Sequence, residues 1–222
     1  MSTKTATLIG ATGLIGNYLL QLLLEDPYFE TVRILIRRPY ELKHPKLEKK
    51  IVDFTNGDSM LVAVDNSDVV FCTVGTTQRK VKGNKDAYRK VDYDIVVNAA
   101  RFSKMTGCGK FILVSSVGAN SKSNNFYLKL KGEVEVAVDS AGLNTVHIMR
   151  PSILLGDRIE FRLGEKIGKV FMSAFSFLLP SKYRPIHAGD VAKAMLAAAK
   201  KSDEGFFIRE YNAIKQSIKS MQ

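Results

Sequence analysis

Three glycines near the start of the chain constrain its fold more than any other feature. Gly10, Gly13 and Gly16 follow an apolar run over residues 6–9 and precede a leucine-rich segment over residues 14–24. One glycine permits a turn that a Cβ would obstruct, a second lets backbone approach a phosphate, and a third lets helix and strand pack closely. The pattern predicts a strand, a turn and a helix whose N-terminus faces a dinucleotide pyrophosphate. A plain tight turn is the alternative.

Two adjacent arginines end the next apolar run, residues 32–36. Arg37 stands twenty-one residues after Gly16, with Arg38 beside it, where a dinucleotide fold usually carries an acidic residue. A carboxylate there accepts hydrogen bonds from the ribose 2′-hydroxyl of NAD, whereas guanidinium groups pair with the 2′-phosphate of NADP. We therefore expect NADP(H) rather than NAD(H). Two solvated arginines in a turn before Pro39 are the alternative.

Strand-like and helix-like patterns alternate along the chain. They predict a doubly wound α/β fold with a parallel sheet, that is, a Rossmann fold, forming one domain over residues 1–222. Ligands of such sheets bind at the carboxyl ends of the strands. The expected strands cover residues 5–9, 32–36, 49–53, 68–74, 110–114 and 143–149, and the clearest helices cover residues 14–25, 86–105, 126–141 and 189–200.

Four residues at the ends of the third and fourth expected strands are candidates for contact with adenosine. Asp53 and Phe54 end one strand, and Val74 and Gly75 end the next. An aspartate there can accept a hydrogen bond from the adenine amino group, and a glycine lets backbone approach the adenosine.

A serine pair, a tyrosine and a lysine follow the fifth expected strand. Tyr127 comes eleven residues after Ser116, and Lys131 four residues after Tyr127. Tyrosine and lysine at this spacing share one helix face, so the ammonium lies near the phenol and near a bound ribose. A free phenol has a pKa of about 10, and a neighbouring cation favours phenolate, which brings proton transfer within working range. A nearby serine hydroxyl can hold a substrate carbonyl. An incidental Tyr/Lys pair and ordinary serine capping are the alternatives.

These motifs together resemble the short-chain dehydrogenase/reductase superfamily, in its extended or atypical branches. The resemblance covers nearly the whole chain, and the Gly-x-x-Gly-x-x-Gly spacing is similar to that of the short-chain enzymes. Several segments look like the Tat-interacting-protein-type oxidoreductases of this superfamily: residues 71–77, 91–94, 115–119 with 127–135, and 150–158.

The resemblance implies an NADP(H)-dependent oxidoreductase that reduces a carbonyl group. Tyr127 matches the proton donor and Lys131 its ribose-binding partner, while Ser116 matches the catalytic serine and Ser115 is the reserve. The expected cofactor contacts are Gly10, Thr12, Gly13, Leu14, Ile15, Gly16, Arg37, Arg38, Asp53, Phe54, Val74, Gly75, Tyr127, Lys131, Pro151, Leu154 and Arg162.

The sequence departs from the family pattern at one catalytic position. The better-studied branches complete a catalytic tetrad with an asparagine that has no clear counterpart here. Asp92 occupies that region, and Asn98 is expected on a helix surface. The missing asparagine affects the expected proton relay but not the expected cofactor binding.

The chain carries a net charge of +11, and six of its Lys and Arg residues fall within residues 79–90. A solvated loop is the default interpretation of this segment, and an anionic partner is the alternative. No tandem aromatic residues stand beside these charges to stack bases, so we expect no nucleic-acid partner.

The two cysteines and the first four residues of the chain indicate the cellular compartment of the protein. Cys72 and Cys108 have neither metal-ligand spacing nor a disulfide framework, so we expect reduced thiols and no bound metal. Residues 1–4 lead into a strand without an apolar targeting segment, which predicts a cytoplasmic protein. A monomer and a homodimer are both compatible with the sequence.

The last third of the chain is expected to cover the substrate. Residues from about 156 to 222 are expected to supply a lid and C-terminal helices, and the apolar run over 169–179 is too short to span a bilayer. Core or lid packing is expected for this run, with a membrane-surface role as the alternative. Asp190 is expected in the first turn of a helix, and His187 is read as structural, with a role in the site as the alternative.

Two functional classes follow from these features. The first is an NADPH-dependent reductase of a small carbonyl compound. The second is a regulator that senses NADPH and recruits a protein partner with little turnover. The Ser116, Tyr127 and Lys131 set favours the enzyme, and the basic segment with the altered tetrad favours the sensor.

Overall fold

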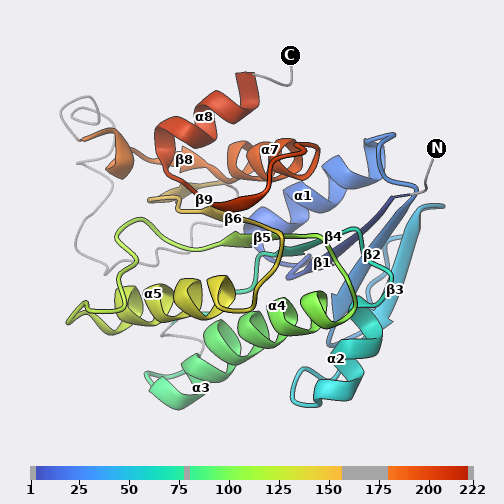
Figure 1. Cartoon of the computed structure of the whole chain (residues 1–222), viewed down its shortest axis with the longest axis horizontal. Coiled ribbons are helices and arrows are strands. Elements are labelled where there is room, and N and C mark those ends of the chain that lie inside the picture. Colours follow the sequence, from blue (N-terminus) through green and yellow to red (C-terminus); the bar gives the residue numbers. More distant parts are fainter. Residues whose placement is uncertain (1–3, 78–80, 157–179, 220–222) are drawn as a thin grey trace.

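A computed structural model describes the protein over residues 4–77, 81–156 and 180–219. Seven strands form one sheet whose neighbouring strands are all parallel, in the order β3-β2-β1-β4-β5-β6-β9 (Figure 1). The strands are β1 (Thr5–Ile9), β2 (Thr31–Ile36), β3 (Leu47–Ile51), β4 (Val69–Cys72), β5 (Lys110–Val114), β6 (Thr145–Met149) and β9 (Gly205–Arg209). This order confirms the doubly wound parallel fold.

Helices cover both faces of the sheet (Figure 1). One layer holds α1, α7 and α8, and the other holds α2, α4 and α5, with α3 next to α4. The helices are α1 (Leu14–Glu25), α2 (Gly57–Val64), α3 (Lys85–Arg89), α4 (Ile95–Met105), α5 (Phe126–Asp139), α7 (Ala188–Ala199) and α8 (Tyr211–Lys219). A π-helical turn, Lys90–Asp94, joins α3 to α4, and a 3-10 turn spans Ser181–Tyr183.

Each helix layer buries its own hydrophobic core against the sheet. Leu19, Leu23 and Val191 pack with Phe71 on the side of α1 and α7. Met60 and Val96 lie in the cluster on the other side, together with Phe111 and Leu113 of β5. Strands β4 and β6 are buried along their whole length, as the continuous apolar runs of a parallel sheet predict.

The observed elements differ from the expected ones mainly at the edges of the sheet. Strand β3 begins at Leu47 rather than at residue 49, because this edge strand carries Glu48, Lys49 and Lys50 and has no apolar run. Strand β9, at the other edge, and the short helix α2 were not among the expected elements, whereas α8 is one of the C-terminal helices expected within residues 156–222. Two two-residue strands, β7 (Leu154–Leu155) and β8 (Ile186–His187), also form a small separate sheet.

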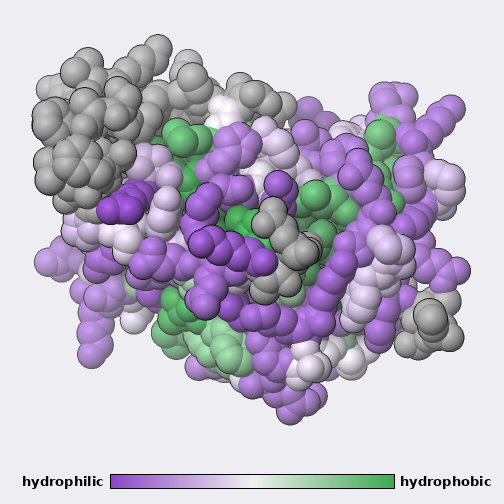
Figure 2. All heavy atoms as spheres, turned by 90° about the horizontal axis from the view of Figure 1, so that it is seen from above, coloured by the Kyte–Doolittle hydropathy of each residue, from purple (hydrophilic) through white to green (hydrophobic). Residues whose placement is uncertain are grey.

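Hydrophilic residues cover most of the face seen from above, and hydrophobic residues show there in separate groups (Figure 2). Helix α7 is mostly buried: ten of its residues are buried, while Lys193 is exposed. Among the described residues, no helix is both long enough and apolar enough to cross a membrane. The single-domain organisation over residues 1–222 stays a prediction.

A buried histidine lies between β6 and β9, away from the expected site residues. His147 is fully buried and stacks on Phe207, with ring centres 4.9 Å apart. Its Nε2 lies 3.2 Å from Asp203 Oδ1, and its Nδ1 accepts a hydrogen bond from Arg209 Nε at 3.3 Å. Because Nδ1 accepts from Arg209, a neutral imidazole carries its proton on Nε2, and neither Nε2 nor Asp203 Oδ1 forms a hydrogen bond within the described part of the chain. Burial lowers the pKa of His147 from 6.5 to about 4; Arg209 and Lys110 also lower it, and Asp203 opposes them.

This histidine predicts a loss of stability in mild acid. The unfolded chain takes up the proton near pH 6.5 and the folded chain only near pH 4, so stability is complete above pH 6.5 and falls as the pH drops toward 4. We expect His147 to contribute about 3 kcal/mol of this loss. Urea unfolding between pH 7 and 4 should show a shallower pH dependence for His147→Gln, whereas exposed His44→Gln should retain the wild-type dependence. Equal slopes for both variants contradict the assignment.

Candidate active site

The glycine turn lies between β1 and α1 and is packed too closely for side chains. Gly10 has φ +93°, and a Cβ there would lie 2.7 Å from Thr73 Oγ1. A Cβ on Gly16 would lie 2.1 Å from the carbonyl oxygen of Gly10. Gly13 donates its N–H to the same carbonyl at 2.9 Å and precedes the first residue of α1. The first N–H groups of a helix lack partners within the helix, so the turn places hydrogen-bond donors at the start of α1.

Thr73 ties this turn to the end of β4. Its hydroxyl donates to the carbonyl oxygens of Ile9 and Gly10, both at 3.1 Å. The sequence analysis did not single out this threonine. Its position directly after a buried strand was the available signal, because side chains at that position reach the carboxyl edge of the sheet.

The paired arginines stand at the same edge of the sheet as the glycine turn. Strands β1 and β2 are in register with Ile9 beside Leu35, so Gly10 follows β1 where Ile36 ends β2. Arg37 and Arg38 come next and are both exposed. The fold thus brings two guanidinium groups to the edge where the turn offers its N–H donors.

The expected adenosine contacts also lie at this edge. Asp53 is exposed, and its Oδ1 accepts hydrogen bonds from the N–H and hydroxyl of Thr55 at 2.9 and 2.6 Å. These bonds lower the pKa of the Asp53 carboxyl. Phe54 packs against the hydrophobic core on the α2 side, and Val74 and Gly75 are half-buried after β4.

The structure separates the two serines that follow β5. Ser115 is buried and donates its hydroxyl to Glu135 of α5. Arg150 holds the same carboxylate with two hydrogen bonds, one of them from Nε at 2.9 Å. The hydrogen bond to Glu135 is the largest contribution to the raised pKa of Arg150. Ser116 is half-buried, and its hydroxyl donates to the carbonyl of Val117 at 3.3 Å.

Tyr127 and Lys131 lie on one face of α5, as their spacing predicts. The Lys131 ammonium is 6.0 Å from the centre of the Tyr127 ring. It also lies 2.9 Å from Asp92 Oδ1, and the two side chains are 2% and 0% exposed. Asp92 comes from the π-helical turn between α3 and α4, where an extra residue per turn changes the direction of the side chains. Turns of this kind recur at functional sites.

Asp92 and Tyr88 together hold the loop after β4. Asp92 Oδ2 accepts the N–H of Thr76 at 2.7 Å, and the Tyr88 hydroxyl donates to the carbonyl oxygen of Thr76 at 3.0 Å. The Tyr88 ring meets the Tyr127 ring edge to face at 6.4 Å. Sequence analysis missed Thr76 and Tyr88. A threonine after the strand was a weak signal, and the partner of Tyr88 is visible only in the folded chain.

Three expected residues follow β6. Pro151 is buried and Leu154 is half-buried, packed against the core around α1. A Cβ on Gly156 would lie 2.9 Å from a methyl of Leu14, so this loop lies against the start of α1. Arg162 and the apolar run over 169–179 lie outside the described residues, as do Arg79 and Lys80 of the basic segment.

Two further candidates, His187 and Asp190, stabilise the start of helix α7. His187 is the N-cap of α7: its Nδ1 accepts the N–H of Gly189 at 3.1 Å, and its ring contacts Tyr18. Asp190 lies in the first turn of α7, 2.9 Å from Lys215.

Cys72 and Cys108 are buried free thiols whose pKa values burial raises to about 11. In the basic segment, Lys85 and Arg89 belong to helix α3 rather than to a loop, and Arg89 pairs with Glu133.

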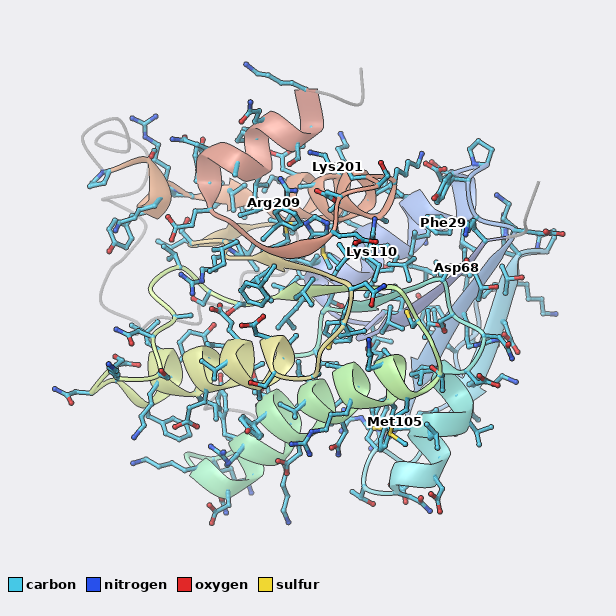
Figure 3. All side chains as sticks on the ribbon, viewed as in Figure 1. Phe29, Asp68, Met105, Lys110, Lys201 and Arg209 are labelled. Carbon is cyan, nitrogen blue, oxygen red and sulfur yellow. The ribbon has the colours of Figure 1, made fainter. Side chains whose placement is uncertain are left out.

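A cavity of about 320 Å³ lies at the opposite, amino ends of the strands. Phe29, Asp68, Lys110 and Lys201 are among its lining residues (Figure 3). Two of its cations have partners, since Lys4 pairs with Asp68 at 2.7 Å and Lys110 donates to the last carbonyls of α7, including Ala199 at 3.2 Å. The described residues contain no cluster of His, Cys, Asp or Glu suited to a metal ion.

The residues at the carboxyl edge fit a dinucleotide. The glycine turn is a close backbone approach in which a Cβ on Gly10 or Gly16 would collide with Thr73 or Gly10, and it stands at a helix N-terminus with two arginines alongside. Backbone N–H groups and a helix N-terminus suit a pyrophosphate. Ser116 and Tyr127 follow β5 at the same edge of the sheet.

Comparison with known proteins agrees with this geometry. Residues 10–202 match a family model described as NAD(P)H-binding. Protein HTATIP2 of Rattus norvegicus is 35% identical over 199 residues, which are 88% of this chain and 81% of that protein. The mitochondrial protein FMP52 of Candida albicans is 30% identical over 204 residues, which are 89% of either chain.

Solved structures show the same fold at low sequence identity. The Bordetella bronchiseptica enzyme WbmH in complex with NAD⁺ has a TM-score of 0.73 at 17% identity, covering 97% of this chain and 79% of that one. MoeE5 in complex with UDP-glucose and NAD has a TM-score of 0.69 at 15% identity, covering 98% and 82%. At these identities the likeness concerns the fold alone.

Proposed function

Since the chain belongs to the NAD(P)H-binding family and to the short-chain dehydrogenase/reductase superfamily, we propose that it is an NADPH-dependent reductase of a small carbonyl compound. One observation carries the proposal: the ammonium of Lys131 lies 6.0 Å from the Tyr127 ring, on the helix that follows β5. A pure cofactor sensor needs no such pair for proton transfer.

The proposed roles follow from chemistry and burial. Ser116 is the serine that holds the carbonyl oxygen, because the hydroxyl of Ser115 is already bound to buried Glu135. Tyr127 donates the proton to that oxygen. Lys131 orients the nicotinamide ribose. Bound NADPH supplies the hydride, and the glycine turn holds its pyrophosphate.

Replacing Tyr127 with phenylalanine tests the enzyme assignment. We expect kcat to fall by roughly 10²- to 10⁴-fold, because the proton donor is lost. NADPH affinity should stay near the wild-type value. The measurement is NADPH oxidation across a panel of aldehydes and ketones, with NADPH binding followed in parallel by fluorescence.

The same panel discriminates the second candidate, an NADPH-sensing regulator with little turnover. The ion pair of Lys131 with Asp92 is the observation that favours it, because Asp92 stands where related enzymes carry a catalytic asparagine. Tight NADPH binding without oxidation of NADPH by any carbonyl would favour the sensor and count against the enzyme.

Arg37 and Arg38 support NADP(H) over NAD(H), because guanidinium groups pair with a 2′-phosphate. Replacing both with alanine removes two charge-assisted contacts, so we expect NADPH affinity to fall by roughly 100-fold while NADH affinity changes little. Titrations of both cofactors against wild type and the double variant measure this. A similar loss for both cofactors is incompatible with recognition of the 2′-phosphate.

Substrate, assembly and location are part of the same proposal. The substrate is a small carbonyl compound, and the protein is a monomer or homodimer in the cytoplasm. The curated name of the fungal relative FMP52 contains "mitochondrial", which describes that protein. Cell fractionation and sedimentation of the purified chain test location and assembly.

A further inference from the structure

The ion pair between Lys131 and Asp92 bears on how the proposed catalytic tyrosine ionises. Lys131 Nζ lies 2.9 Å from Asp92 Oδ1 and 6.0 Å from the centre of the Tyr127 ring. Both members of the pair are buried, at 2% and 0% exposure. A charge that water does not screen acts more strongly on its neighbours. The carboxylate is therefore close enough to oppose the effect of the ammonium on the phenol.

Asp92 is held in this position by more than the ion pair. Its second oxygen accepts the Thr76 N–H at 2.7 Å, and Thr76 is itself bound by the Tyr88 hydroxyl. A carboxylate with fixed partners on both oxygens has little freedom to turn away. The residue thus links the loop after β4 to the lysine of α5.

Two other carboxylates of α5 have partners of their own. On α5, Glu133 pairs with Arg89 at 2.7 Å, and Glu135 binds Arg150 of the β6 end. Cys72 of β4 interacts electrostatically with both Lys131 and Asp92. Burial raises the pKa of its thiol to about 11, so the thiol stays neutral. Tyr88 of α3 faces Tyr127 and donates its hydroxyl proton to Thr76.

We infer that Asp92 is a positioning residue that offsets the charge of Lys131 and keeps the Tyr127 phenol protonated, which biases the site toward reduction of a carbonyl. The inference rests on the proposed function and deepens it. An ammonium paired with a carboxylate stabilises a phenolate less than a free ammonium does. A reductase needs the phenol, whereas oxidation of an alcohol needs the phenolate.

The atoms balance in the favoured direction. The phenol O–H bond of Tyr127 breaks, and its proton joins the carbonyl oxygen held by Ser116. The carbonyl carbon accepts the hydride and its electron pair, so NADPH is oxidised to NADP⁺ and the carbonyl is reduced to an alcohol. Solvent then returns a proton to Tyr127.

The test measures ionisation of Tyr127 directly, without turnover. The ultraviolet absorbance of phenolate is titrated against pH in each variant, and the same titration with Tyr127→Phe added isolates the signal of Tyr127. We expect Asp92→Asn, which keeps an oxygen for the Thr76 N–H, to move the midpoint down by about one pH unit. Exposed Asp94→Asn, from the same helical turn, loses the same charge and should leave the midpoint in place. An unchanged or higher midpoint in folded Asp92→Asn overturns the inference.

A second variant avoids leaving a buried charge alone. Lys131→Met combined with Asp92→Asn removes both charges, so a pair that cancels at the phenol should leave the midpoint within about half a pH unit of wild type. A rise of a full unit or more shows that Lys131 acts uncompensated and overturns the inference.

The two proposals fail separately. A shifted midpoint in a protein that turns over no carbonyl supports the role of Asp92 and rejects the reductase. If the protein turns over a carbonyl but the midpoint of the Tyr127 titration is the same in wild type and Asp92→Asn, the result supports the reductase and rejects the role of Asp92. In an active enzyme, Asp92→Asn should also move the pH profile of alcohol oxidation to lower pH by a similar amount.

Discussion

Replacing Gly16 with alanine is expected to lower the free energy of unfolding by about 3 kcal/mol and to weaken NADPH binding by roughly tenfold or more. The added Cβ would stand 2.1 Å from the Gly10 carbonyl oxygen and 2.7 Å from the Thr73 hydroxyl. Neither neighbour is the free end of a flexible side chain, so the glycine turn itself must move. Urea unfolding and NADPH titration measure the two effects.

Gly109→Ala is the matched control for this prediction. Nothing lies within 4 Å of a Cβ built on Gly109, and its backbone is outside the left-handed region. We expect unfolding and NADPH binding close to wild type. If Gly16→Ala behaves like Gly109→Ala, helix α1 does not approach β1 as closely as described.

Replacing Lys131 with methionine is expected to cost about 3–5 kcal/mol of stability, because it leaves the buried carboxylate of Asp92 without its counter-charge. Asp92 then retains the N–H of Thr76 as its described hydrogen-bond donor. Proton uptake by Asp92 should restore part of the loss as the pH falls. Urea unfolding at neutral and mildly acidic pH measures both effects.

The control for this prediction is the double variant Lys131→Met with Asp92→Asn. Removing both charges leaves no unpaired ion in the interior, and replacing a buried pair by neutral groups is often close to neutral for stability. We expect the double variant to be more stable than the single one by about 2 kcal/mol or more. Equal stabilities of the two variants contradict a buried ion pair.

Local sequence patterns were sufficient for the centre of the sheet and for much of the site. The core strands are continuous apolar runs, and α1 and α5 begin and end near the expected residues. The helix expected over residues 86–105 is divided into α3, the π-helical turn and α4. The pattern placed β3 two residues too late and missed β9, because edge strands are only partly buried and need no apolar run. It failed at α2 for another reason, since eight residues give too little periodicity to identify a helix.

The sequence by itself determined the glycine turn, the two arginines after β2 and the shared face of Tyr127 and Lys131, because each depends on neighbours within one turn or one strand end. Only the tertiary structure decided which serine is free of a buried carboxylate and which residue faces Lys131. Glu135, Arg150 and Ser115 come from three elements, and Asp92 stands thirty-nine residues before Lys131. Such pairings depend on how helices pack against the sheet, so a single sequence does not reveal them.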